Sequence, residues 1–168
     1  MRYSTEWYAT DRRYHAITDY LGDRVGLHIL DFGCWNSYFA ARLAHDYDHH
    51  VIAVDNTPIT PAPGVEVVNK YLGPKDIRRL GHFDAGLCLS VLHHQKQPRS
   101  YLNALLAVCE VLFVESAHPD ETLPGVDTHK HSPMILTEIA KHHPTALCDT
   151  PGWDENYHRT LWVIDQRP

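Results

Sequence analysis

The sequence lacks the features that would mark a membrane or multidomain protein. It contains no run of about 18 apolar residues, and its N-terminal segment has no apolar h-region, so neither a membrane span nor a signal peptide is indicated. Internal repeats, low-complexity stretches and long linkers are absent as well. These absences predict one cytoplasmic domain over residues 1–168, with no membrane partner.

Paired cysteines and an excess of basic residues are also missing. The four cysteines form no Cys-x-x-Cys pair, and three of them lie in apolar runs, so we expect free thiols and no metal site. The net charge is −6, whereas nucleic-acid-binding surfaces are usually basic. The 14 histidines would offset that charge at acidic pH. A nucleic-acid partner is therefore possible but less favoured.

What the sequence does contain is an alternation of strand-like and helix-like segments. Apolar runs predict strands at 27–32, 49–55, 65–69, 83–94, 110–116, 145–149 and 160–166. Helical periodicity and start signals predict helices at 11–21, 36–47, 75–80 and from 98 and 132 onward. This order predicts an α/β fold with a doubly wound, mostly parallel seven-stranded sheet and a C-terminal antiparallel edge hairpin. Its ligand site is expected at the carboxyl ends of the strands.

The first strand-to-helix corner, LDFGCWNSYFA, has a single glycine, Gly33. A dinucleotide-binding corner uses further glycines to admit a pyrophosphate, and the Gly-Lys-Ser/Thr ending of a P-loop is absent. Asp55 follows about 20 residues later at the end of the next strand, where an acid can hold ribose hydroxyls. The corner therefore suits a nucleoside without phosphates, such as S-adenosylmethionine, whose carboxylate would lie at the helix start near Asn36.

Three segments in the same order carry a resemblance to a known family. LDFGCWNSYFA resembles the first motif of class I S-adenosylmethionine-dependent methyltransferases, VIAVDNTP resembles their ribose-binding strand end, and FDAGLCLSVLHH resembles their fourth strand. The likeness covers nearly the whole chain and implies the Rossmann-like methyltransferase fold. The sequence departs from the pattern at Ser37, where many members have glycine.

The resemblance implies a set of cofactor-binding residues. Asp31 would orient the loop and the methionine amino group, Gly33 would keep the backbone clear of the ligand, and Asp55 would bind the ribose. The full predicted set for S-adenosyl-L-methionine is Asp31, Gly33, Trp35, Asn36, Asp55, Asn56, Asn69 and Ser90.

Residues near the transferred methyl group form the second predicted set. A neutral imidazole has a suitable pKa for a general base, which makes His93 or His94 the catalytic candidate. The alternative is that both histidines only brace the loop. Glu115, His118 and His129 are predicted to bind the acceptor, and the segment 127–133 is predicted to form a lid over it.

The sequence thus predicts methyl transfer to an oxygen or nitrogen of a small or carrier-presented acceptor. Two alternatives stay open: an RNA or DNA methyltransferase, and a catalytically silent subunit that binds S-adenosylmethionine. The sequence does not indicate the oligomeric state.

Overall fold

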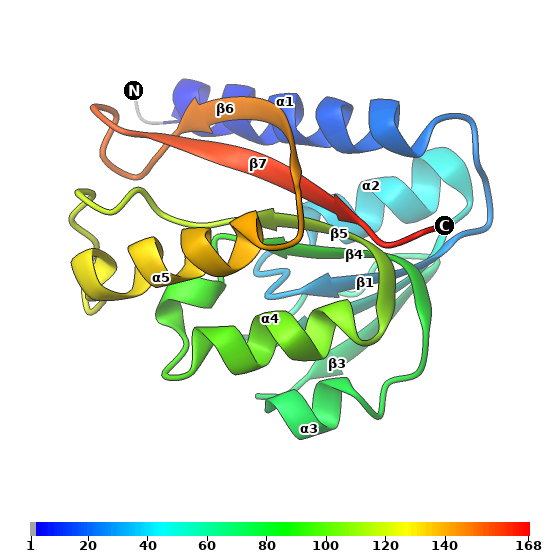
Figure 1. Cartoon of the computed structure of the whole chain (residues 1–168). Coiled ribbons are helices and arrows are strands. Elements are labelled where there is room, and N and C mark those ends of the chain that lie inside the picture. Colours follow the sequence, from blue (N-terminus) through cyan, green and yellow to red (C-terminus); the bar gives the residue numbers. More distant parts are fainter. Residues whose placement is uncertain (1–2) are drawn as a thin grey trace.

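The computed structural model describes the backbone of residues 3–168 and the side chains of residues 10–168. Seven strands form one sheet in the order β3-β2-β1-β4-β5-β7-β6 (Figure 1). The strands are β1 (His28–Phe32), β2 (His50–Asp55), β3 (Val65–Asn69), β4 (Phe83–Leu89), β5 (Cys109–Glu115), β6 (Thr145–Pro151) and β7 (His158–Asp165). The helices are α1 (Tyr3–Leu21), α2 (Tyr38–Tyr47), α3 (Pro74–Ile77), α4 (Pro98–Leu106) and α5 (Thr128–Ala140), with a 3₁₀ turn η1 (Leu92–His94).

Only β7 runs against the other strands. It pairs antiparallel with both β5 and β6, while β1 to β5 pair in parallel. The predicted doubly wound sheet with a C-terminal antiparallel hairpin is confirmed. Because β6 runs in the same direction as β5, its carboxyl end lies at the same edge of the sheet as those of β1 to β5. We call this edge the carboxyl edge.

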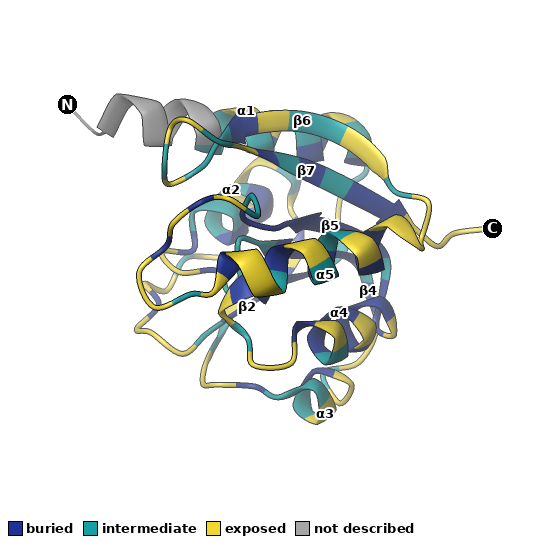
Figure 2. Cartoon of the chain, turned by 60° about the vertical axis from the view of Figure 1, so that its left-hand side comes forward, coloured by how far each residue is buried: buried dark blue, intermediate teal, exposed yellow. Residues whose placement is uncertain are grey.

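The core consists of two apolar layers, one on each face of the sheet. The central strands are buried on both sides and supply alternate residues to the two layers: in β1, Ile29 faces one layer and Leu30 the other. Helices α1 and α2 cover the first face, and α3, α4 and α5 cover the second. Figure 2 shows the dark, buried strands between helices whose outer surfaces are exposed.

Two predicted boundaries are wrong. The strand predicted over 83–94 ends at Leu89, and residues 92–94 form η1, because Ser90 turns the chain with a positive φ of 60°. The predicted lid is the start of α5, which begins one turn before Ser132. The side chain of Asp127 accepts the N–H of Lys130 and caps the helix there, so that Pro133 lies inside it.

Other helix boundaries also differ from the predictions, and α2 begins at Tyr38 rather than at residue 36. Helix α1 begins at Tyr3, well before residue 11, and α3 is a short helix over Pro74–Ile77. No helix in the described part of the chain is both long and apolar enough to cross a membrane.

Candidate functional site

The loop between β1 and α2 has a glycine-like backbone with only one glycine. Gly33, Trp35 and Ser37 have φ values of 78°, 46° and 55°, in the left-handed region that non-glycine residues rarely occupy. Ser37 therefore keeps the backbone conformation that a glycine favours. Its side chain does not cap α2; instead Asn36 Oδ1 accepts the N–H of Tyr38 at 3.2 Å.

Backbone and side-chain hydrogen bonds fix this loop against the tip of β2. The N–H groups of Gly33 and Cys34 donate to the carbonyl of Val54 at 2.8 and 3.1 Å. The N–H of Trp35 donates to Asp55 Oδ2 at 2.9 Å, and Ser37 Oγ donates to the carbonyl of Thr60 at 3.1 Å. The loop is thus pre-formed next to the acid predicted to bind ribose.

Gly33 has the side chain of Val91 packed closely beside it. A Cβ on Gly33 would stand 2.2 Å from Cγ2 of Val91, which follows β4. Only the fold shows this contact, because Val91 is distant from Gly33 in the sequence. That Gly33 also keeps the backbone clear of the cofactor stays a prediction.

Asp31 is a buried acid with an unsatisfied oxygen. Only 4% of the residue is exposed, and its Oδ2 has no hydrogen-bond partner. Burial, followed by a smaller contribution from the charge of Asp55, raises its pKa to about 7. A buried carboxylate oxygen without a partner is costly, and a cationic ligand group at the tip of β1 would complete it.

Asp55 holds the turn that follows β2. Its Oδ1 accepts both the N–H and the hydroxyl of Thr57 at 2.8 Å, while Oδ2 accepts Trp35 N–H. A carboxylate has about four lone-pair sites, so one site is left for a ligand hydroxyl. A second ligand hydroxyl would have to replace one of these protein donors, of which the Thr57 hydroxyl moves most easily.

Two asparagines accompany this acid. Asn69 Nδ2 donates to the carbonyls of Asp55 and Thr57 at 3.0 and 2.6 Å, so it braces the tips of β2 and β3. Asn56 is exposed beside them. Both lie at the carboxyl edge, where the adenine end of the cofactor was predicted, and their contact with it stays a prediction.

A buried ionic network lies at the tips of β4 and β5. Glu115 is 0% exposed. Its carboxylate accepts Arg13 Nε at 2.6 Å and Arg13 Nη2 at 3.0 Å, and Ser90 Oγ donates to it at 2.5 Å. Arg159 Nη1 donates to the same Ser90 Oγ at 2.9 Å. Glu115 is therefore enclosed by protein groups and positions them, and its predicted contact with the acceptor stays a prediction.

The partners in this network are not predicted by the sequence. Arg13, Glu121 and Arg159 are absent from the predicted site residues. Arg13 and Glu115 are 102 positions apart in the chain, so no local spacing joins them. One signal was available: an acid at the end of a continuous apolar strand requires a cationic partner.

His93 braces the loop that follows β4. Its imidazole is 1% exposed, and Nδ1 accepts the N–H of Ala117 at 3.1 Å. Burial, with smaller effects of His94 and Arg159, lowers its pKa to about 3. The lone pair that a base would use is engaged, so the geometry favours the bracing alternative for His93. His94 is exposed, and burial of part of its ring lowers its pKa; its role as a base stays a prediction.

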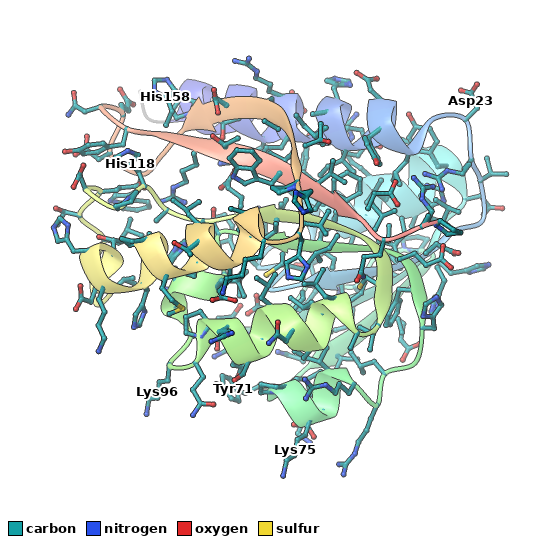
Figure 3. The ribbon with its side chains drawn as sticks, in the orientation of Figure 1. Asp23, Tyr71, Lys75, Lys96, His118 and His158 are labelled. Atoms are coloured by element: carbon teal, nitrogen blue, oxygen red, sulfur yellow. The ribbon has the colours of Figure 1, made fainter. Side chains whose placement is uncertain are left out.

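The other two predicted acceptor residues lie beside this network. The His118 ring stacks on Tyr157 with centroids 4.9 Å apart. His129 is exposed in the first turn of α5, and its Nδ1 lies 3.9 Å from Asp120 Oδ1. In Figure 3 His118 and His158 lie together at one end of the molecule, while Asp23 lies at the other.

The strand order, the reversed seventh strand and the two acids at the tips of β1 and β2 define the class I S-adenosylmethionine-dependent methyltransferase fold. The chain has this fold, and its sequence is similar to members of the class, so the resemblance stated from the sequence is confirmed.

No family model matches the sequence. Two similar proteins are the tRNA U34 carboxymethyltransferases of Klebsiella pneumoniae and Colwellia psychrerythraea. The first is 30% identical over 140 residues, covering 72% of this chain and 41% of that protein. The second is 25% identical over 138 residues, covering 72% and 42%. The chain thus spans less than half the length of the curated relatives it matches.

Solved structures show the same fold. The bifunctional kinase-methyltransferase WbdD aligns with a TM-score of 0.71 at 16% identity, over 97% of this chain and 39% of that one. Magnesium protoporphyrin IX methyltransferase from Synechocystis PCC 6803, with bound SAH, aligns at 0.64 and 14% identity, over 93% and 83%. The Burkholderia thailandensis 1,6-didemethyltoxoflavin-N1-methyltransferase, bound to 1,6-didemethyltoxoflavin and S-adenosylhomocysteine, aligns at 0.61 and 19% identity, over 90% and 76%.

Proposed function

We propose that the chain transfers a methyl group from S-adenosylmethionine to an oxygen or nitrogen of a small or carrier-presented acceptor. The observation that carries this proposal is Asp31, a buried acid whose Oδ2 has no partner. Asp31 lies near the end of β1, just before the loop that carries the left-handed Trp35 and Ser37. That loop is tied to Asp55 through the N–H of Trp35. That arrangement supports a ligand with an ammonium group at one end and a ribose at the other.

Each part of the corner has a separate role in this proposal. Asp31 would accept the amino group of the methionine portion, and the positive end of the α2 dipole would face its carboxylate. Asp55 would accept one ribose hydroxyl through its remaining lone pair. It would accept the second ribose hydroxyl if the Thr57 hydroxyl moved away. Asn56 and Asn69 would lie near the adenine.

The chain's own contribution to the chemistry is placement. When bound, S-adenosylmethionine would supply an electrophilic methyl group on a sulfonium, and neutral S-adenosylhomocysteine would be the leaving group when an acceptor lone pair takes that methyl. Ser90, held by Glu115 and Arg159, fixes the tip of β4 on the acceptor side. Positioning of the acceptor lowers the barrier, and His94 is the exposed imidazole available to take a proton from it.

Solved relatives of the fold support a small acceptor, since one of them holds 1,6-didemethyltoxoflavin. The similarity to tRNA U34 carboxymethyltransferases supports an RNA acceptor as the second candidate. A silent cofactor-binding subunit would bind the cofactor without turning it over. A cytoplasmic location and a single domain over residues 1–168 remain part of the proposal.

Calorimetric titration with S-adenosylhomocysteine tests the cofactor site. We expect saturable binding that Asp55→Ala weakens by more than about tenfold, the loss of roughly one charge-assisted hydrogen bond. Asp23→Ala, an exposed acid at the opposite end of the molecule, is the matched control and should bind normally. No binding to the wild type at millimolar ligand would contradict the proposal.

Turnover separates the alternatives once binding is established. Release of S-adenosylhomocysteine from S-adenosylmethionine is measured with a small-molecule extract and with total RNA as acceptor pools. Release with the small-molecule pool supports the proposal, and release with RNA alone supports the second candidate. Binding without release from either pool identifies a silent subunit.

A further inference from the structure

The loop between β6 and β7 is fixed by a buried carboxylate that belongs to a different segment. Glu121 is 0% exposed. Its Oε1 accepts the N–H of Trp153, and that of Asp154 at 3.3 Å. A Cβ on Gly152 would stand 2.6 Å from the same oxygen, so glycine is needed for this close approach. Glu121 therefore holds the loop backbone at two consecutive residues, and Gly152 allows the close packing just before them.

Arg159 completes this arrangement and joins it to the proposed active site. Its Nε donates to Glu121 Oε2 at 2.9 Å and its Nη2 to Oε1 at 2.6 Å. The remaining Nη1 donates to Ser90 at the tip of β4. The loop is consequently fixed relative to the acceptor side of the site, and not only to its own hairpin.

The residue presented by this rigid loop is a tryptophan. Trp153 is 65% exposed, although its backbone N–H is bonded to the buried Glu121. The stacked pair His118–Tyr157 belongs to the same two loops. A flat aromatic side chain on a fixed backbone loses little conformational freedom on binding and offers a large contact area.

The position of the exposed aromatic residues supports a ligand-binding role. Among residues 10–168, the exposed large apolar side chains are Val25, Trp35, Tyr71 and Trp153. The three aromatic ones follow β1, β3 and β6, at the carboxyl edge, whereas Val25 precedes β1 at the opposite edge. Trp35 and Tyr71 lie on the cofactor side of the sheet order, and Trp153 lies on the acceptor side.

Charge near Trp153 decides which kind of aromatic partner fits. The segments 116–127 and 151–158 contain no lysine or arginine and five acids. Glu121 is buried and paired with Arg159, and the other four are Asp120, Asp127, Asp154 and Glu155. An acidic surface repels the phosphates of a polynucleotide. A free, uncharged ring does not meet this repulsion.

We propose that Trp153 binds the acceptor by stacking on a planar heteroaromatic ring of a small molecule. The Arg159–Glu121 pair acts as the positioning device that holds the loop ready for that contact. The inference rests on the proposed methyl transfer and adds the chemical class of the acceptor.

Calorimetric titration of the S-adenosylhomocysteine-loaded protein with uracil, lumazine and lumiflavin tests this. Affinity should rise from one ring to three, because stacking scales with the ring area. Trp153→Ala should weaken lumazine binding by about tenfold, as expected for loss of one aromatic stack. Trp153→Phe should retain binding within about threefold, since a flat face remains. Val25→Ala, an exposed apolar residue at the other edge, should leave it unchanged.

Three results would each overturn the inference. The first is that no ring binds the wild type at millimolar concentration, and the second is that Trp153→Ala binds lumazine as the wild type does. The third is that oligouridylate binds far more tightly than uracil, with a steep salt dependence. The last result would assign the edge to single-stranded RNA. Titration with S-adenosylhomocysteine alone keeps the two proposals distinct. If Trp153→Ala binds S-adenosylhomocysteine normally and its affinity for the rings is also unchanged, the inference fails and the proposed function stands.

Discussion

At the scale of single residues, the corner after β1 keeps an unfavourable backbone. Trp35 and Ser37 both have positive φ, and a left-handed conformation costs a non-glycine residue about 1–2 kcal/mol. Trp35 is 68% exposed, so packing of its indole does not offset this cost. The conformation of Trp35 is held by the hydrogen bond from its N–H to Asp55. Trp35 also lies next to the candidate cofactor site. Strain of this kind is typical of functional sites.

Replacement of Trp35 by glycine should therefore stabilise the protein. We expect the free energy of unfolding in urea to rise by about 1 kcal/mol, since glycine adopts this φ without strain and keeps the N–H bond. Val25→Gly is the matched control, because Val25 is equally exposed but has no positive φ, and it should lose stability. Equal losses in both variants would show that the turn at Trp35 is not strained.

At the scale of elements, one ion pair joins helix α1 to the carboxyl end of β5. Arg13 and Glu115 are 14% and 0% exposed at their side chains, with Nε and Oε2 2.6 Å apart. Ser90, and Arg159 at 4.0 Å, face the same carboxylate. Removal of one partner from a buried pair leaves an uncompensated charge, which costs more than the pair itself contributes. The position of α1 beside the acceptor side thus depends on this contact.

The expected consequence is a strongly non-additive double-mutant cycle. Arg13→Met should lower the free energy of unfolding by about 3 kcal/mol, whereas the double variant Arg13→Met/Glu115→Leu should lose clearly less than the two single changes together. Arg79→Ala, which breaks an exposed pair with Asp76 at 3.9 Å, should change stability by less than about 1 kcal/mol. Additive losses at Arg13 and Glu115 would rule out their coupling.

At the scale of the whole molecule, two buried groups give stability opposite dependences on pH. The pKa of Asp31 is raised to about 7 and that of His93 lowered to about 3. The folded protein therefore holds a proton at Asp31 more tightly than the unfolded chain, and its contribution to stability is lost as pH rises toward 7. The neutral imidazole of His93 is favoured by folding, so its contribution is lost as pH falls below about 6.5. Between about pH 4 and 6.5 the two effects oppose each other.

Single substitutions should separate these contributions. The wild type loses the Asp31 contribution as pH rises, and Asp31→Asn does not. The free energy of unfolding of Asp31→Asn minus that of the wild type should therefore rise by up to about 1.4 kcal/mol per pH unit between pH 4 and 7. His93→Asn, whose Oδ1 can still accept the Ala117 N–H, should show the opposite trend over about pH 4 to 6.5. Urea unfolding at several pH values measures both. A difference from wild type that stays constant with pH would contradict the assigned protonation states.

Most of the elements and the type of sheet are predictable from the sequence. The apolar runs and helical spacing are local, so they predict the strands, the main helices and the antiparallel hairpin at the C-terminus. The positions of Asp31 and Asp55 near the ends of β1 and β2 were predictable for the same reason, since each lies at the end of an apolar run. Their contacts with a cofactor stay predictions. The fold added the unsatisfied oxygen on Asp31 and the bonds that already occupy Asp55.

The side-chain contacts on the acceptor side of the site can be found only in the folded structure. Arg13 meets Glu115 across 102 positions, Arg159 meets Glu121 across 38, and Val91 fills the space beside Gly33. The left-handed Ser90 ends β4 before the histidines, and Asp127 begins α5 where a lid was predicted. Hydrophobic periodicity reports which residues face a core, but it does not report which side chains meet when distant segments pack. Buried charges find their partners only in the folded chain, because burial itself creates the need for them.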